Sequence, residues 1–322
     1  MRKSEAVPDE ILDIIINNRF FLITSHKNPD GDAIGSMLAM AAILKKMGKE
    51  TYLFLEDGVP PLYRFLPLVE EVNTVLAGKF DITLVLDCEN GGRVSDRVDL
   101  FSHARTLINI DHHPTTGTFG DYRYINPRAA AVGEQVHALA RALDVAIDRN
   151  MAECIYVSIL TDTGSFRYAN TTAHTHRLAA GLIEHGLQPA EIASRIYERR
   201  SLNQLSLQAA IIEDMVVEDT LAWSVISQDR LKDLKLSESD LDGAIDIIRS
   251  VDGVRVAVLF SQRFDGKIKA SLRSKNNFNV LEIARELGGG GHRAAAGFLS
   301  SEPLSVIVEK TVQLLREHLG LR

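Results

Sequence analysis

Residues 25–36 read Ser-His-Lys-Asn-Pro-Asp-Gly-Asp-Ala-Ile-Gly-Ser and decide how this sequence is expected to fold. An apolar run of strand length, 20–24, precedes them, and apolar side chains at helical spacing follow. His26, Asp30 and Asp32 are therefore predicted to lie on a turn from a strand into a helix. Open α/β sheets form their ligand crevice at such strand ends.

The same stretch also has a simpler interpretation as a turn. Asn, Pro, Asp and Gly all favour turns, and Asp32 could cap the helix that follows. Gly31 allows the main chain to turn tightly between Asp30 and Asp32 in either case. A ligand site is favoured, because acidic and histidine side chains follow further predicted elements downstream.

One of these side chains follows a predicted central strand. Residues 82–86 are continuously apolar, which is typical of a strand buried on both faces of a sheet. Asp87 comes directly after this strand and so repeats the position of the first cluster. We interpret it as a site residue in preference to a cap for the segment that begins at Gly91.

Two further positions repeat this arrangement. Residues 107–110 form another predicted strand, and residues 111–113, Asp-His-His, come directly after it. Adjacent histidines at a strand end are hard to explain by packing, although a polar loop is the alternative. A helix predicted over 149–160 leads into Asp162, which is a site residue or an ordinary helix end beside Gly164.

These positions together supply more donors than one cation needs: His26, Asp30, Asp32, Asp87, Asp111, His112, His113 and Asp162. Two divalent cations ~3.5–4 Å apart, bridged by one carboxylate, suit the set and favour hydrolysis at phosphorus. Carboxylates with fewer imidazoles favour manganese, with magnesium or cobalt as substitutes. Structural zinc is not expected, because neither cysteine has a partner at the spacing of a zinc site.

Residues 288–291 are four consecutive glycines, followed by His292 and Arg293. They come after a predicted helix, so they do not match the dinucleotide-binding fingerprint, which lies between a strand and a helix. We interpret them as a loop whose main-chain N–H groups approach a phosphate or a base. A flexible connection from a helix to a strand is the alternative.

Composition narrows the class of protein. A chain of 322 residues allows two domains. A net charge of −7 argues against a protein that grips long duplex DNA through many phosphates, but not against a small phosphorylated substrate. Two cysteines make no disulfide framework, and neither a signal peptide nor a membrane-spanning run is found, so a cytoplasmic location is expected.

These motifs resemble those of the DHH phosphoesterase superfamily, which is named after the Asp-His-His triplet. The C-terminal part resembles the associated DHHA1 domain. The matching positions are residues 26–32, Asp87, residues 111–113 and Asp162, and, in the C-terminal part, residues 271–274 and 289–292. The resemblance covers nearly the whole chain. In size, the chain is most similar to proteins of the branch that degrades nanoRNA and dephosphorylates 3′-phosphoadenosine 5′-phosphate (pAp).

The resemblance implies an α/β fold with two domains. The N-terminal DHH domain would have a parallel sheet with flanking helices, and the smaller C-terminal DHHA1 domain would also be α/β. The expected bounds are residues 1–200 for the catalytic, metal-binding domain, 201–216 for a helical linker and 217–322 for the substrate-binding domain.

The resemblance also implies roles for single residues. One manganese would be held by His26, Asp30 and Asp87. The second would share Asp87 and add Asp32, His112 and Asp162. In catalysis, His113 would face the scissile phosphate and Asp111 would orient a histidine. The substrate's phosphate or terminal nucleotide would be bound by Arg273, Gly289, Gly290, Gly291 and His292.

The expected activity is two-manganese hydrolysis of short oligonucleotides to mononucleotides and of pAp to AMP. Its partners would then be short single-stranded oligonucleotides and small phosphorylated nucleotides, and no membrane binding is expected. Since dimers are common among such relatives, a second copy of the chain is a further expected partner. Two alternatives stay open. One is a phosphodiesterase for cyclic-di-AMP or linear dinucleotides, and the other is a non-enzymatic nucleotide or metal sensor.

Overall fold

The computed structural model describes residues 6–113, 118–199, 201–241, 243–275 and 278–321. The chain divides into two compact units, Met1–Glu198 and Arg199–Arg322, each described here by itself. The first contains α1 (Asp9–Asn17), β1 (Phe20–Thr24), α2 (Gly31–Lys46), β2 (Glu50–Phe54), β3 (Val72–Asn73), β4 (Phe80–Leu86), β5 (Ala104–Asp111), β6 (Tyr122–Ile125), α3 (Val132–Ala142), α4 (Arg149–Asp162), α5 (Ala173–Ile183) and α6 (Pro189–Tyr197). The second contains α7 (Leu202–Glu213), β7 (Val216–Glu218), β8 (Leu221–Ile226), α8 (Gln228–Asp233), α9 (Ile245–Ser250), β9 (Val256–Gln262), β10 (Ile268–Ser274), α10 (Val280–Glu286), β11 (Gly290–His292), β12 (Ala295–Ser300) and α11 (Leu304–Leu319).

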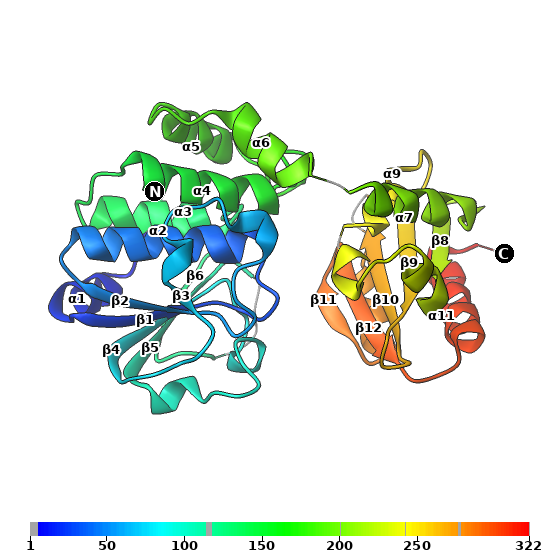
Figure 1. The fold of residues 1–322 in the computed structure, drawn as a ribbon, viewed down its shortest axis with the longest axis horizontal. Helices are drawn as coiled ribbons and strands as arrows, with labels where there is room; N and C mark the ends of the chain where they lie inside the picture. The colour runs from blue at the N-terminus through cyan, green and yellow to red at the C-terminus, as the bar shows by residue number, and fades with distance from the viewer. Residues whose placement is uncertain (1–5, 114–117, 200, 242, 276–277, 322) are drawn as a thin grey trace. The chain divides into compact units, whose positions relative to one another are not determined.

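The sheet of the first unit is parallel throughout. Within the described residues it has six strands in the order β3-β2-β1-β4-β5-β6 (Figure 1). The strand order reverses between β1 and β4, which is the point where open α/β sheets bind ligands. The register pairs Thr24 with Val85 and Leu86 with Ile110, so β1, β4 and β5 end side by side.

Both faces of this sheet are buried. Leu84 and Leu86 of β4 face a core shared with α2, α3 and α4, whereas Val85 points into a smaller core on the opposite face. Figure 1 shows α2, α3 and α4 along one side of the sheet. The continuous apolar run in β4 follows from this two-sided burial. The predicted α/β fold with an N-terminal parallel sheet is therefore confirmed.

Helix α2 approaches α4 closely because small residues lie at their contact. A Cβ atom added at Gly35 would lie 2.4 Å from the carbonyl oxygen of Cys154 and 2.9 Å from the nitrogen of Ser158. A Cβ at Gly31 would lie 2.4 Å from the Thr161 side chain. This contact holds the start of α2 beside the end of α4, which brings Asp32 and Asp162 toward each other.

The second unit has a mixed sheet. In the part that the structure describes, its strands run in the order β11-β12-β10-β9-β8-β7, with β8 and β9 parallel and the other neighbours antiparallel. One core lies under α10 and α11, and another lies under α7, α8 and α9 on the opposite face. The smaller C-terminal α/β unit is thus also as predicted.

Two segments differ from their sequence-based expectations. The helix expected as a linker over 201–216 is α7, which packs into the core of the second unit through Leu207, Ala210 and Ile211. The glycine run is a loop only in part, because Gly290–His292 forms β11 and pairs with β12, whereas Gly288 and Gly289 precede that strand. A Cβ at Gly289 would lie 2.1 Å from the carbonyl oxygen of Gly297, so this glycine permits the close approach of main chains.

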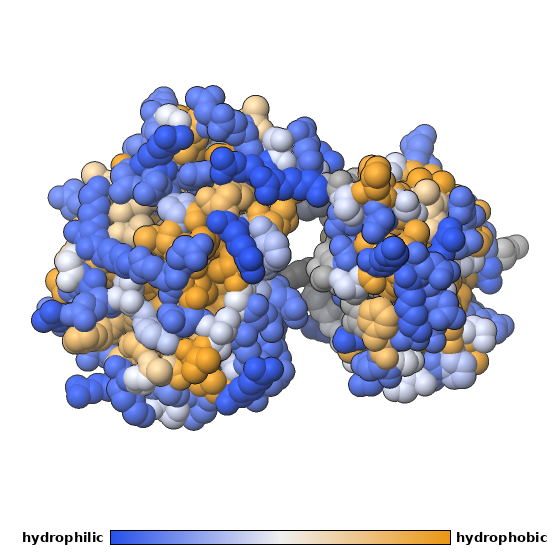
Figure 2. All heavy atoms as spheres, in the orientation of Figure 1, coloured by the Kyte–Doolittle hydropathy of each residue, from blue (hydrophilic) through white to orange (hydrophobic). Residues whose placement is uncertain are grey.

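The visible surface of each unit is mostly hydrophilic, with smaller hydrophobic areas between (Figure 2). Phe21, Phe54 and Phe260 are almost completely buried, whereas Phe20 and Phe264 are exposed. Among the helices described, none has both the length and the apolar character required to cross a membrane.

The packing of α2 against α4 leads to a stability prediction. Gly35→Ala should destabilise the protein by about 1–3 kcal/mol, because the added methyl group overpacks a tight contact. The matched control is Gly181→Ala in α5, where an added Cβ meets nothing within 4 Å. That change should stabilise the protein by about 0.5–1 kcal/mol, because alanine favours the helix. Urea unfolding followed by circular dichroism measures both, and a Gly35→Ala protein as stable as wild type would contradict the packing argument.

Candidate metal centre

The first two donors meet where the strand order reverses. His26 follows β1 and Asp87 follows β4, and the parallel register places them at the same edge of the sheet. His26 Nε2 lies 3.5 Å from Asp87 Oδ2, and both side chains are at least nine-tenths buried. Asp87 has a φ of +54°, in the left-handed region that non-glycine residues rarely adopt. Such strained conformations cluster at functional sites.

His26 and His112 each have a ring that is oriented by a main-chain carbonyl. His26 Nδ1 donates to the oxygen of Lys27 at 2.8 Å, and His112 Nδ1 donates to the oxygen of Ala129 at 3.1 Å. A carbonyl oxygen can only accept, so Nδ1 must carry the hydrogen in both rings. Nε2 is then the atom that each ring presents to the carboxylates, as in histidines that bind metals.

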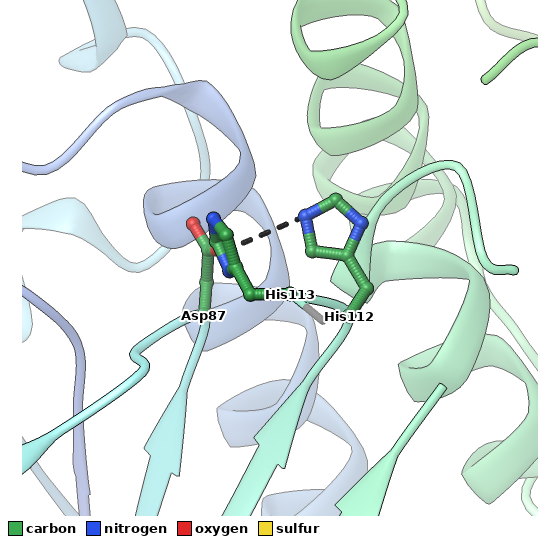
Figure 3. Close-up of side chains that lie close together, drawn as sticks. All are labelled: Asp87, His112 and His113. Atoms are coloured by element: carbon green, nitrogen blue, oxygen red, sulfur yellow. Dashed lines mark ion pairs between the residues drawn. The ribbon is translucent and has the colours of Figure 1, made fainter. Parts of the chain in front are cut away.

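His112 lies among three carboxylates. Its Nε2 atom is 3.7 Å from an oxygen of each of Asp32, Asp87 and Asp162. These separations are longer than hydrogen bonds. Figure 3 shows Asp87, His112 and His113 meeting just beyond the ends of β4 and β5. The imidazole therefore faces a space that the acidic side chains share.

Three groups of side chains in the described ranges have donor atoms within 4.8 Å of one another. They are Asp87, His112 and His113; His26, Asp30 and Asp87; and Asp32, His112 and Asp162. Asp87 Oδ1 is buried and has no hydrogen-bond partner. A buried anionic oxygen without a donor is costly, and a cation would satisfy it. The donor set therefore fits divalent metal binding.

The two aspartates of the first motif have different neighbours. Asp30 is the cap of α2, because its Oδ1 accepts from the main-chain nitrogens of Asp32 and Ala33 at 3.0 and 3.1 Å. The possibility that Asp32 caps this helix is therefore wrong. Asp32 instead accepts from the nitrogen of Val132, the first residue of α3, at 2.8 Å and from Ser158 Oγ at 2.5 Å. Its carboxylate is thus fixed by two other helices.

The neighbouring charges shift the pKa values of the donors. Burial by itself would raise the pKa of Asp87, but the three adjacent imidazoles lower it to about 2. For His112 the directions are reversed. Burial by itself would lower its pKa, but the surrounding carboxylates outweigh this effect and raise the pKa to about 9. The Asp162 carboxyl has its pKa raised to about 7 by burial and by the charges of Asp87 and Asp30. Without a cation, this site therefore holds protons at neutral pH.

Asp111 organises the turn that carries both histidines. Its Oδ1 accepts from His113 Nδ1 at 2.7 Å and from the main-chain nitrogen of His112 at 2.8 Å. The Asp111 side chain is fully buried at the end of β5, so it holds the His113 ring in a fixed orientation. It belongs to none of the three donor groups.

The site also contains residues that sequence reasoning missed. Ser158 donates to Asp32, and Asn170 donates through Nδ2 to Asp162 Oδ2 at 3.2 Å. Ser158 falls within the helix predicted over 149–160, and Asn170 falls in none of the predicted motifs. No sequence pattern distinguished them, because both contacts depend on how separate segments pack.

The proposed substrate-binding residues lie in the second unit. Arg273, Gly290 and Gly291 line a pocket of about 260 Å³ on the sheet, next to Lys269 and Ser271. Lys269, Ser271 and Arg273 alternate along β10 and so share one face. Gly289 precedes β11, and His292 ends it, with its side chain outside the described part.

Comparisons with known proteins agree with these features. The model for the DHH family, N-terminal domain, matches residues 21–159, and the model for the DHHA1 domain matches residues 220–317. The bifunctional oligoribonuclease and PAP phosphatase NrnA of Thermus thermophilus is 35% identical over 92% of this chain and 89% of its own. The NrnA protein of Bacillus subtilis is 29% identical over 92% of this chain and 95% of its own.

A solved structure has the same fold. The exopolyphosphatase-related protein from Bacteroides fragilis matches with a TM-score of 0.89 at 23% identity, over 99% of this chain and 96% of that one. At this identity the likeness concerns the fold alone. Because the sequence matches extend over both units and the acidic and histidine motifs meet at one sheet edge, the chain belongs to the DHH family of phosphoesterases, carries a DHHA1 domain and is a phosphoric ester hydrolase.

Proposed function

We propose that this chain hydrolyses short oligoribonucleotides (nanoRNA) to mononucleotides and pAp to AMP, with manganese as its cofactor. The similar Thermus and Bacillus proteins are named for an oligoribonuclease and a PAP phosphatase activity. The observation that carries the proposal is the buried Asp87 carboxylate. One of its oxygens has no hydrogen-bond partner, and Asp87 is common to two of the three donor groups.

The donors around Asp87 fit two divalent cations that would share it. One cation would be held by Asp87 together with His26 and Asp30. The other would be held by Asp87 together with Asp32, His112 and Asp162. Carboxylates with a minority of imidazoles suit manganese, and magnesium or cobalt are substitutes. When bound, such a pair supplies positive charge at the phosphate and lowers the pKa of the attacking water.

His113 would act on the substrate itself. Because Nδ1 donates to Asp111, the ring would present Nε2 to a phosphate oxygen. Burial lowers the pKa of His113, but the hydrogen bond to Asp111 and the charge of Asp87 outweigh this and raise it. A raised pKa favours the protonated ring, which can donate a hydrogen bond to the phosphate or a proton to the leaving oxygen.

The pocket of the second unit would bind the rest of the substrate. Arg273 would take the neighbouring phosphate, because its planar guanidinium can form two parallel hydrogen bonds to phosphate. The terminal nucleotide would lie against Gly289, Gly290, Gly291 and His292. These contacts would involve only the end of the substrate. The net charge of −7 provides no general attraction for the many phosphates of a long strand. Very short strands are therefore the favoured substrates.

The shared carboxylate gives the first test. Asp87→Asn should abolish hydrolysis and reduce bound manganese below two ions per chain, because it removes the charge that both cations would share. Asparagine tolerates a φ of +54°, so the fold should survive. Metal analysis and hydrolysis of a diribonucleotide measure the two effects. Asp81→Asn, at the other end of β4, is the control, and near-normal turnover of Asp87→Asn would contradict the two-metal assignment.

The protons held by the site give the second test. His112, with its pKa raised to about 9, must lose a proton before it can bind a cation. Manganese affinity should therefore rise from pH 6 to pH 8, by up to about tenfold per pH unit for each displaced proton. Calorimetry in two buffers of different ionisation enthalpy should also detect released protons. An affinity that is independent of pH would show that no protonated ligand is displaced.

Substrate length gives the third test. Dinucleotides should be hydrolysed with a higher kcat/KM than strands of twenty or more nucleotides. Arg273→Ala should lower kcat/KM on dinucleotides roughly 10- to 150-fold. This factor corresponds to the loss of a charged hydrogen bond worth about 1.5–3 kcal/mol. Bound manganese should not change. Arg230→Ala, which removes an exposed ion pair with Glu213, is the control. Equal rates at all lengths, or a wild-type-like Arg273→Ala protein, would exclude this pocket from substrate selection.

A further inference from the structure

Residues 129–133, which include the first two residues of α3, directly hold two donors of the second ligand set. The carbonyl oxygen of Ala129 accepts from His112 Nδ1 at 3.1 Å. At the other end of the segment, the nitrogens of Val132 and Gly133 donate to the Asp32 carboxylate at 2.8 and 3.3 Å. One stretch of main chain therefore sets the orientation of both side chains.

The third donor, Asp162, is connected to the same segment by Asn170. Asn170 Nδ2 lies 2.9 Å from the carbonyl oxygen of Ala130, 3.1 Å from the main-chain oxygen of Asp162 and 3.2 Å from Asp162 Oδ2. All three neighbours are acceptors, so the NH2 group and not the amide oxygen must face them. The amide thus bridges the end of α4 to the segment that holds Asp32 and His112.

Asp162 depends on such a bridge more than the other two carboxylates near His112 do. Its side chain is 29% exposed, whereas Asp32 is 1% exposed and Asp87 is 4% exposed. Among these three carboxylates, packing therefore restricts that of Asp162 least. In the part of the chain that the structure describes, Asn170 is the residue whose hydrogen bond to this carboxylate fixes its direction.

We propose that Asn170 is a positioning residue that aims the Asp162 carboxylate at the cation shared with Asp32 and His112. The proposal rests on the function proposed above, since it assumes that Asp162 binds metal. Hydrogen bonds to metal ligands commonly change metal affinity by about 10- to 100-fold when they are removed. A purely structural role would instead affect stability and leave metal binding unchanged.

The test is a manganese titration by calorimetry of the full-length chain and of Asn170→Ala. The wild type should bind two ions. Asn170→Ala should bind one of them with about 10- to 100-fold lower affinity and the other unchanged. Asn73→Ala is the matched control. Asn73 lies in β3, and its Nδ2 also donates to two main-chain oxygens, those of Leu53 and Glu71. It should bind manganese as the wild type does.

The outcomes separate this inference from the proposed function. A wild type that binds no manganese contradicts the metal centre itself. A wild type that binds two ions, together with an identical Asn170→Ala isotherm, overturns the role of Asn170 alone. If circular dichroism shows that Asn170→Ala is unfolded, the isosteric Asn170→Asp, which lacks both N–H donors, is titrated in its place. Loss of the fold in both variants also overturns the proposal, because Asn170 would then serve the fold.

Discussion

The gathering of carboxylates around one imidazole is the constraint on which this site depends. Asp32, Asp87 and Asp162 each place an oxygen 3.7 Å from the same nitrogen of His112. Buried like charges at such distances repel one another. Neighbouring imidazoles and main-chain N–H groups offset part of this repulsion, and bound protons offset more. The same carboxylates outweigh the effect of burial and raise the pKa of His112 to about 9.

The fold holds these charges together by making their supports rigid. The ends of β1, β4 and β5 are aligned by parallel pairing. Gly31 and Gly35 allow α2 to lie against α4 so closely that a single added methyl group would collide with it. Asp32 is further fixed by the first nitrogens of α3 and by Ser158. The Asp32 carboxylate therefore has little freedom to move away from the other acidic side chains.

Much of this arrangement could be predicted from local patterns. The continuous apolar run of β4 and the helical periodicity after Asp32 indicated buried elements, and the acidic and histidine residues at their ends indicated a shared rim. The short strands β6 and β11 were not predicted, because they exist only through pairing with a neighbour. The glycines of β11 were interpreted as a loop for the same reason, since their close approach to β12 is visible only in three dimensions.

The sequence by itself determined the types of donor, their order along the chain and the strand and helix ends on which they lie. Only the tertiary structure decided which atoms face one another. Asp32 accepts from Val132, a residue 100 positions away, and Asn170 connects Asp162 to Ala130. These contacts depend on strand register and on how closely the helices pack. Local propensities carry no information about either, because they describe each segment before it meets its partners.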